Sequence, residues 1–255
     1  MVAGAVGVIA VRWELSPAAQ LVAFCPCMIL VPGPHLLNGA LDLARARIAL
    51  GSFRIGYACF IIVVICTGLV AGLTLGGVSL PVSQSGAPVP LVYDVLAAGV
   101  AVAAFGTFFA MPWRMLPVPM AIGMAAHAAR WATIALAGGS VETGALVACL
   151  LVGVVATPIT DRWRLPFAAF AFASVVSLMP GVFLFRTAGG LVALVGQGAA
   201  APPALLLGVV VDATTALLIL LAMAFGLIVP KLLIEHFVPS LVTDGAMRKS
   251  ATIRA

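Results

Sequence analysis

Charge is the scarcest property of this 255-residue sequence: only 8% of its residues are charged, whereas 64% are hydrophobic. A soluble domain carries about 25% charged residues, so this chain cannot cover a water-facing surface. Aromatic residues are also few, at 7%, whereas the 26 glycines suit close packing between helices in lipid. The composition therefore predicts an all-α, polytopic integral membrane protein whose solvent is the lipid bilayer.

Several functional signatures are missing as well. The basic residues lie between apolar segments, where membrane orientation explains them, so the net charge of +5 indicates no nucleic-acid partner. Residues 1–11 lack the basic start and the cleavage site of a signal peptide. The five cysteines show no zinc spacing, and Cys25-Pro26-Cys27 has no histidine or carboxylate beside it. We therefore expect no metal and no cofactor.

An enzyme and a channel are not expected either. An intramembrane enzyme needs paired aspartates, a Ser/His pair or a zinc motif, and the sequence places only Asp212 deep inside a span. A passive channel needs a ring of charges or a repeated filter motif, and neither is present.

Eight apolar segments are candidates for membrane spans, which need about 20 residues each. They are Val2–Val11, Pro17–Val31, Phe53–Gly76, Val92–Met111, Pro117–Ala137, Thr143–Thr157, Leu165–Phe185 and Pro203–Val229. The first is too short for a complete span and is typical of the end of a helix. The uncharged segment Gly77–Leu91 is rich in Gly, Ser and Pro, which predicts a loop.

Two Pro-Gly steps, Pro32-Gly33 and Pro180-Gly181, stand 148 residues apart inside apolar stretches. Proline and glycine together stop a helix, and in hydrocarbon a broken backbone is tolerated only where protein or a water-filled cavity covers it. Two broken helices in corresponding positions point to the binding site of a transporter. The sequence leaves open whether these steps lie at the midplane or form paired gates nearer the two surfaces.

The chain also contains an internal repeat. Arg12-Trp13 resembles Arg162-Trp163 at an offset of 150, so a two-residue insertion or deletion relates this match to the Pro-Gly steps. The second copy has five spans, whereas the first keeps only the end of its third span, its fourth and its fifth. The sequence thus predicts an incomplete first repeat (1–77), an extracytoplasmic linker (78–91), a second repeat (92–238) and a basic cytoplasmic tail (239–255).

Because five is an odd number, the second copy must enter the membrane inverted. Basic residues concentrate on the cytoplasmic side of membrane proteins. With Arg45 in the cytoplasm, ten of the 13 Lys and Arg residues lie inside, and the reverse orientation would place those ten outside. We therefore expect an inverted five-helix repeat, with residues 77–91 outside and Arg164 inside.

The order of these motifs resembles the bacterial threonine/serine exporter family. Residues 96–237, with His127-Ala128-Ala129-Arg130 and Met179-Pro180-Gly181, look like the small second-domain subunit of the family's two-component form. Residues 17–76, with Leu30-Val31-Pro32-Gly33, look like the end of the larger first domain.

This resemblance implies an inner-membrane protein of ten spans that exports L-threonine and L-serine with the proton motive force. The family's first domain normally begins with a soluble region and two further spans, so the chain is expected to be amino-terminally truncated or to need a second exporter subunit. The alternative is a partner-dependent or non-transporting subunit of a two-component exporter, for which dicarboxylates are another substrate class. The expected partners are an amino acid and the lipid bilayer, with a homo-oligomer left open.

Ionisable groups at membrane depth cost about 2.5–3.5 kcal/mol each on insertion scales, so each is a candidate functional residue. Asp212 is the strongest, as a proton carrier or a ligand for an ammonium group; the alternative is a structural partner of Arg186 or Arg130. His127 and Arg130 share a helical face, where histidine can titrate and arginine can hold a carboxylate. The alternative is a polar pair that fixes helix packing.

Other candidates follow the breaks. Asn38 lies just past the first break, and Arg186, five residues after Gly181, is placed to attract an anionic group. Asp42 is expected to pair with Arg45 on the surface; the alternative is that its helix lines a cavity. Glu142 is expected to cap its helix, and Asp161 to lie in a loop with a topological role.

Overall fold

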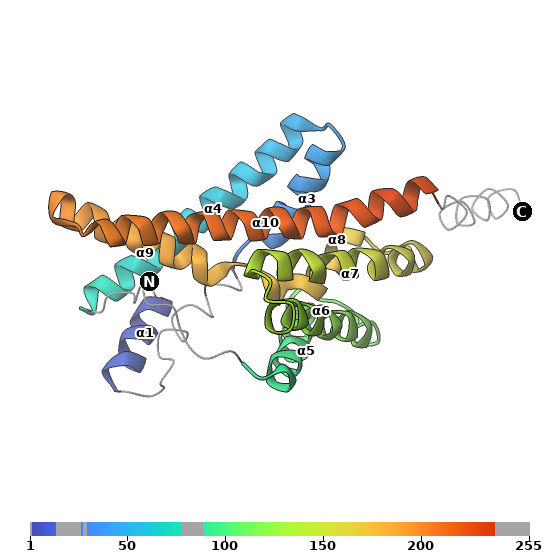
Figure 1. Ribbon diagram of the computed structural model, residues 1–255, viewed down its shortest axis with the longest axis horizontal. Helices are drawn as coiled ribbons and strands as arrows, with labels where there is room; N and C mark the ends of the chain where they lie inside the picture. The colour runs from blue at the N-terminus through green and yellow to red at the C-terminus, as the bar shows by residue number, and fades with distance from the viewer. Residues whose placement is uncertain (1, 14–26, 28–29, 78–88, 238–255) are drawn as a thin grey trace, which may run out of the picture. The chain divides into compact units, whose positions relative to one another are not determined.

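The computed structural model describes residues 2–13, 27, 30–77 and 89–237 (Figure 1). Its elements are α1 (Val2–Arg12), α3 (Gly33–Ala44), α4 (Ile48–Leu75), α5 (Leu91–Phe108), α6 (Pro117–Ala135), α7 (Val141–Trp163), α8 (Phe167–Val175), the 3₁₀ turn η1 (Val176–Leu178), α9 (Gly181–Gln197), the 3₁₀ turn η2 (Gly198–Ala200) and α10 (Pro203–Phe237). Over these residues the chain is helical and contains no strand, which confirms the all-α prediction.

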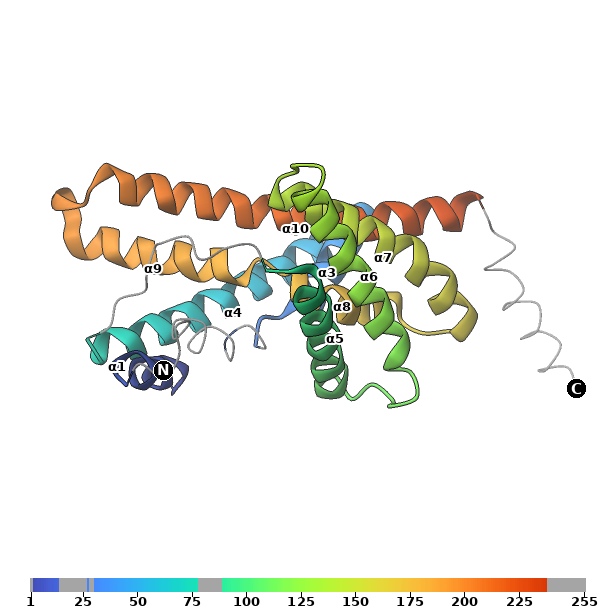
Figure 2. The same cartoon turned by 60° about the horizontal axis from the view of Figure 1, so that its bottom comes forward.

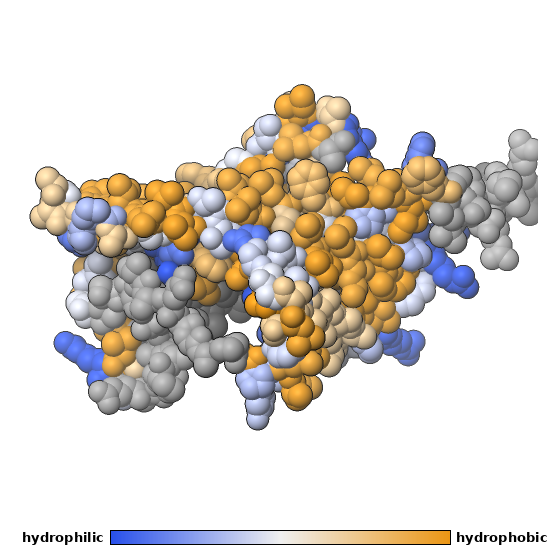
Figure 3. All heavy atoms as spheres, viewed as in Figure 1, coloured by the Kyte–Doolittle hydropathy of each residue, from blue (hydrophilic) through white to orange (hydrophobic). Residues whose placement is uncertain are grey.

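Five of the described helices are long and apolar enough to cross a bilayer: α4, α5, α7, α9 extended by η2, and α10. Helix α1 and the α8–η1 segment are apolar but shorter. Apolar side chains also dominate the visible surface over α7 and the neighbouring part of α10 (Figure 3). A hydrophobic surface of this extent is stable only in lipid, so the chain is a polytopic membrane protein.

Several predicted spans differ from the helices at their boundaries, and α10 continues to Phe237 rather than Val229. The span expected over 165–185 ends at Leu178, because Met179 is extended and Pro180 cannot continue a helix; α9 then begins at Gly181. Helix α7 instead continues past Pro158 to Trp163, since membrane helices tolerate an internal proline. The span expected over 17–31 lies mostly outside the described residues.

Contacts divide the chain into two compact units, and each unit contains segments from both halves of the sequence. Unit 1 comprises Met1–Gly39, Ala49–Ala87 and Pro180–Leu218, and unit 2 comprises Ala40–Ile48, Pro88–Met179 and Ile219–Ala255. Helix α10 contributes its first part to unit 1 and its second part to unit 2.

Close approaches at glycines hold the helices of unit 1 together. Helix α1 meets α4 at Gly4, where a Cβ would lie 2.8 Å from the Cα of Gly72. Helix α9 runs back along the first part of α10 (Figure 2), and a Cβ at Gly190 would clash with a methyl carbon of Val209. Helix α3 likewise meets α4 at Gly39, close to the backbone of Gly51.

In unit 2, helices α5, α6 and α7 surround the short α8, whose residues are mostly buried. Helix α7 crosses the second part of α10 at another pair of glycines: a Cβ at Gly153 would lie 2.6 Å from the carbonyl oxygen of Gly226. The pairs Gly4/Gly72 and Gly153/Gly226 are related by offsets of 149 and 154 residues. The same kind of crossing therefore occurs in both halves of the chain, which supports the internal repeat; its inversion in the membrane stays a prediction.

Candidate functional site

Three polar side chains from three different elements meet inside unit 2. His127 of α6 is 5% exposed; its Nδ1 lies 3.2 Å from Oδ2 of Asp94 on α5, and its Nε2 lies 2.8 Å from Oγ of Ser177 in η1. Both ring nitrogens of a buried imidazole are thus engaged, one by a carboxylate and one by a hydroxyl. We call this arrangement the Asp94–His127–Ser177 relay.

Small residues along α6 bring these side chains together. A Cβ at Gly123 would lie 2.7 Å from a methyl carbon of Val102 on α5 and 2.9 Å from the carbonyl oxygen of Ser174 on α8. Glycine therefore lets α6 approach both neighbours at once. His127 follows Gly123 by one helical turn, and Ser177 follows Ser174 by three residues, so the close approach at Gly123 sets up the contact between their side chains.

The relay lies next to the second Pro-Gly step. Ser177 belongs to the 3₁₀ turn that ends α8, and Met179 and Pro180 then separate this turn from α9. The first backbone bond of α9 runs from Leu184 N–H to the carbonyl of Pro180, at 3.1 Å. The Ser177 hydroxyl is therefore carried by the last turn before the break, where the backbone leaves the α-helical conformation.

Arg130, which the sequence grouped with His127, is half-buried one turn further along α6. Its aliphatic carbons lie against α7, where a Cβ at Gly144 would approach Arg130 Cγ to 3.2 Å. Gly144 lies in the first part of α7, where Ser140 accepts a hydrogen bond from Thr143 N–H at 3.3 Å and Glu142 occupies the first turn. The N-cap is Ser140, and Glu142 adds a favourable charge beside it.

Asp212, the strongest candidate from the sequence, forms a buried ion pair in unit 1. Its Oδ2 lies 3.1 Å from Nε of Arg186, and the two side chains are 3% and 11% exposed. Helices α9 and α10 are thereby joined by a charge pair as well as by the glycine contact at Gly190. This geometry matches the structural alternative for Asp212, and it leaves the proton-carrier role a prediction.

A second ionic cluster lies in unit 2 at the end of α7. Lys231 Nζ lies 2.7 Å from Glu235 Oε1 and 4.0 Å from Asp161 Oδ1, and Arg45 approaches Glu235 to 3.9 Å. Asp161 occupies the last turn of α7 rather than the loop that was expected. Sequence reasoning overlooked this cluster, although a lysine directly after Pro230 inside an apolar run was a visible signal.

The residues around the first Pro-Gly step take different positions. Gly33 begins α3, as Gly181 begins α9, so each Pro-Gly step starts a helix; Pro32 and Asn38 are half-buried, whereas Pro180 is buried. Asp42 is buried rather than on the surface, and it pairs with Arg47 at 3.7 Å. The surface position expected for Asp42 was wrong because its helix packs that face inward.

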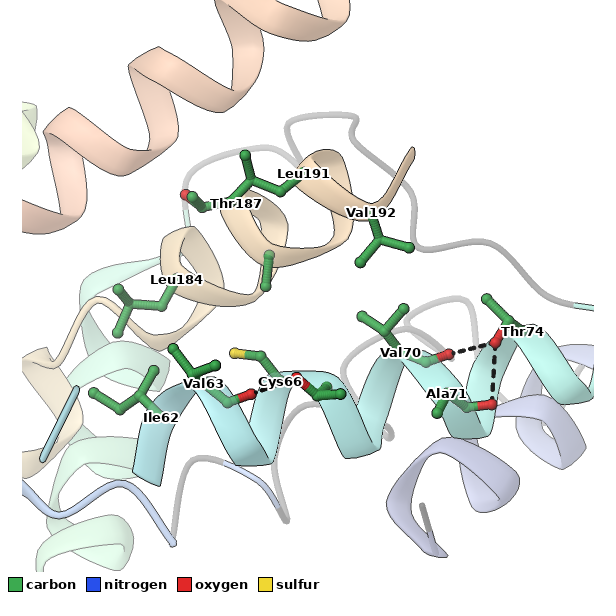
Figure 4. A pocket seen from close by; sticks show the side chains of 12 residues that line it. Ile62, Val63, Cys66, Val70, Ala71, Thr74, Leu184, Thr187, Leu191 and Val192 are labelled. Carbon is green, nitrogen blue, oxygen red and sulfur yellow. Dashed lines mark hydrogen bonds between the residues drawn. The ribbon is translucent and has the colours of Figure 1, made fainter. Parts of the chain in front are cut away.

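Unit 1 also contains a cavity of about 550 Å³ between α4 and α9 (Figure 4). Its walls are apolar apart from three threonines, and each hydroxyl donates to a carbonyl of its own helix: Thr67 to Val63, Thr74 to Val70, and Thr187 to Phe183. These hydroxyls offer no donor to a ligand, and none of the described residues that line the cavity is charged. It suits an acyl chain better than a zwitterion.

Asp94 and Ser177 are the members of this candidate site that sequence reasoning missed. Asp94 stands in the first turn of its span, where a carboxylate is explained by the helix dipole, and Ser177 is an isolated hydroxyl in an apolar run. The available signal was that each of three apolar segments contributes a polar residue, namely Asp94, His127 and Ser177. Among the described residues no three His, Cys, Asp or Glu side chains gather as a metal site.

The apolar helices, the broken segment at Pro180 and the buried charges together define a polytopic membrane protein of the transporter type. The family model described as "Threonine/Serine exporter, ThrE" matches residues 94–233, and a further threonine/serine exporter model matches residues 1–76. The first match covers more than half of the chain, so the protein belongs to the threonine/serine exporter family. No curated protein and no solved structure matches it.

Proposed function

We propose that this protein is a secondary transporter of the bacterial inner (plasma) membrane that exports L-threonine and L-serine with the proton gradient. Family membership supports the substrate class, and both family models match within one chain, which favours an exporter with fused domains over a single-domain subunit of a two-component system. The single observation that carries the coupling is the Asp94–His127–Ser177 relay.

The relay can accept and release a proton with a defined change in hydrogen bonding. With His127 neutral and Nδ1–H donating to Asp94, Nε2 accepts the hydrogen of the Ser177 hydroxyl. When His127 gains a proton, Nε2–H donates to Ser177 Oγ instead, and the serine must direct its own hydrogen elsewhere. The imidazolium then pairs with the Asp94 carboxylate, so both protonation states are accommodated.

This change occurs beside the Pro-Gly break, which gives it a mechanical consequence. Ser177 is two residues from Met179, where the helix is already interrupted. Because the backbone passes from a 3₁₀ turn to an extended conformation at Met179, a reversal of the serine hydroxyl can favour one backbone arrangement over another. Protonation of His127 can thus bias the broken segment between two states, as alternating access requires.

Reconstituted liposomes test this proposal. The variant His127→Gln should lose proton-driven threonine efflux by at least about tenfold, in line with the contribution of positioned proton-transfer groups. It should keep threonine counterflow, because exchange of substrate for substrate moves no net proton. His236→Gln changes an exposed histidine and serves as the matched control.

Each outcome decides the role of His127. Proton-driven efflux at the wild-type rate in His127→Gln would refute the coupling role. Equal loss of efflux and counterflow would assign the relay to structure alone. A wild-type protein that moves neither threonine nor serine in either assay would refute the substrate assignment.

A further inference from the structure

Lys231 is a buried cation on a membrane-spanning helix, and the proton relay makes no use of it. It is 7% exposed, and its Nζ lies 4.7 Å from the centre of the Phe167 ring, which excludes water on that side. Glu235, one turn further along the same helix, lies 2.7 Å away and neutralises the charge. The fold therefore does not need a second carboxylate at this position.

Asp161 nevertheless supplies one, in an arrangement that leaves it poorly stabilised. Its Oδ1 is 4.0 Å from Lys231, which is too long for a hydrogen bond, and its Oδ2 is buried and accepts no hydrogen bond from the described residues. It also occupies the last turn of α7, where the helix dipole disfavours a negative charge. A buried carboxylate oxygen with no donor is costly, so Oδ2 of Asp161 is free to accept a hydrogen bond from a bound ligand.

We propose that Asp161 and Lys231 bind the two charged ends of the exported amino acid; the inference rests on the proposed function and names its binding site. The ligand's ammonium donates to Oδ2 of Asp161, and its carboxylate accepts from Nζ of Lys231. The carboxylate and the ammonium of an α-amino acid are attached to the same carbon. The ligand can therefore lie with its ammonium beside Asp161 and its carboxylate beside Lys231. The ligand thus completes hydrogen bonds that the pair does not make with itself.

Other ligands fit the same cluster less well. A metal ion would lie beside the ammonium of Lys231, and Asp161 and Glu235 are too few for the three-ligand group that a metal site needs. A dicarboxylate would bring two negative charges to a site that already contains two carboxylates. Only a ligand with both signs of charge serves Asp161 and Lys231 together.

The neighbouring Arg45 allows Lys231 to change partners. Arg45 lies 3.9 Å from Glu235, and its side chain is 41% exposed. When Lys231 turns to the ligand's carboxylate, Glu235 keeps a cation beside it. Lys231 can therefore turn to the ligand without leaving the carboxylate of Glu235 unpaired.

Equilibrium binding to the purified full chain in detergent tests the site with three probes. L-threonine carries both charges, L-threoninol lacks the carboxylate, and the hydroxy-acid analogue lacks the ammonium. We expect the wild type to bind threonine at least about tenfold more tightly than either analogue, since hydrogen bonds to charged groups are the stronger ones. Lys231→Met should bind threonine and threoninol equally while still rejecting the hydroxy acid, and Asp161→Asn should show the reverse.

The controls separate this site from general damage. Arg162→Gln changes an exposed neighbour of Asp161 and should keep both discriminations. If Lys231→Met does not fold, the charge-balanced pair Asp161→Asn and Lys231→Met replaces it and should lose both discriminations together.

Two failures are distinguishable. A wild-type protein that binds no threonine would refute the proposed function and this inference with it. A wild-type protein that binds threonine, together with variants that weaken all three probes equally, would reduce Asp161 and Lys231 to a structural ion pair and overturn this inference alone.

Discussion

The ion pair between Arg186 and Asp212 allows one experiment to separate a structural carboxylate from a proton carrier. Both side chains are almost fully buried, and their charged atoms lie 3.1 Å apart. Removing one partner of a buried pair leaves an uncompensated charge and costs about 3–5 kcal/mol, whereas replacing both partners is often close to neutral. We therefore expect Asp212→Asn and Arg186→Gln each to destabilise the protein by about 3–5 kcal/mol, and the double variant to recover most of that loss.

The assay combines unfolding in detergent with threonine efflux from liposomes. If the pair is structural, stability and proton-driven efflux should fall together in the single variants and return together in the double variant. If Asp212 carries the coupling proton, the double variant should regain stability but not efflux. Single variants as stable as the wild type would refute the argument that the pair holds α9 against α10.

Two further predictions concern packing and topology. Gly226→Ala should destabilise the protein by about 1–3 kcal/mol, because its Cβ would lie 2.6 Å from the Cβ of Cys149. The control is Gly56→Ala, since nothing lies within 4 Å of a Cβ at that position. Equal melting temperatures for the two variants would contradict this reasoning. In a cysteine-free background, a membrane-impermeant thiol reagent should label Val89→Cys from outside and Arg164→Cys only from the cytoplasm. Labelling of both from one side would refute the inverted repeat.

The helical membrane fold was predictable because composition alone decides it. With 8% charged residues, no water-soluble arrangement exists, and proline and glycine mark where helices stop. The break at Pro180 was predicted from two residues and is present between η1 and α9. The lengths of the helices were less predictable, since α7 continues through Pro158 by virtue of its surroundings rather than its local sequence.

The candidate sites were predictable only in part. His127 and Asp212 stood out because an ionisable group inside an apolar run is rare. Arg186 was among the partners considered for Asp212, whereas the partners of His127 were not predicted: Ser177 is 50 residues from His127, and the approach at Gly123 explains why the two meet. Asp161 was assigned to a loop because its neighbours Arg162 and Arg164 are basic, and local charge does not reveal that α10 brings Lys231 to it.

The two sites proposed in unit 2 share one element, and this bears on how transport is coupled. The short α8–η1 segment begins at Phe167, whose ring lies against Lys231, and its final turn contains Ser177, which bonds to His127. Most of this segment is buried among α5, α6 and α7, and packed interiors shift between discrete arrangements rather than deform continuously. A change in the hydrogen bond of Ser177 and a ligand beside Phe167 would therefore act on the same short helix. Coupling between proton and amino acid needs such a shared element whose equilibrium both sites bias, and α8–η1 meets that requirement without any contact between the two ligands.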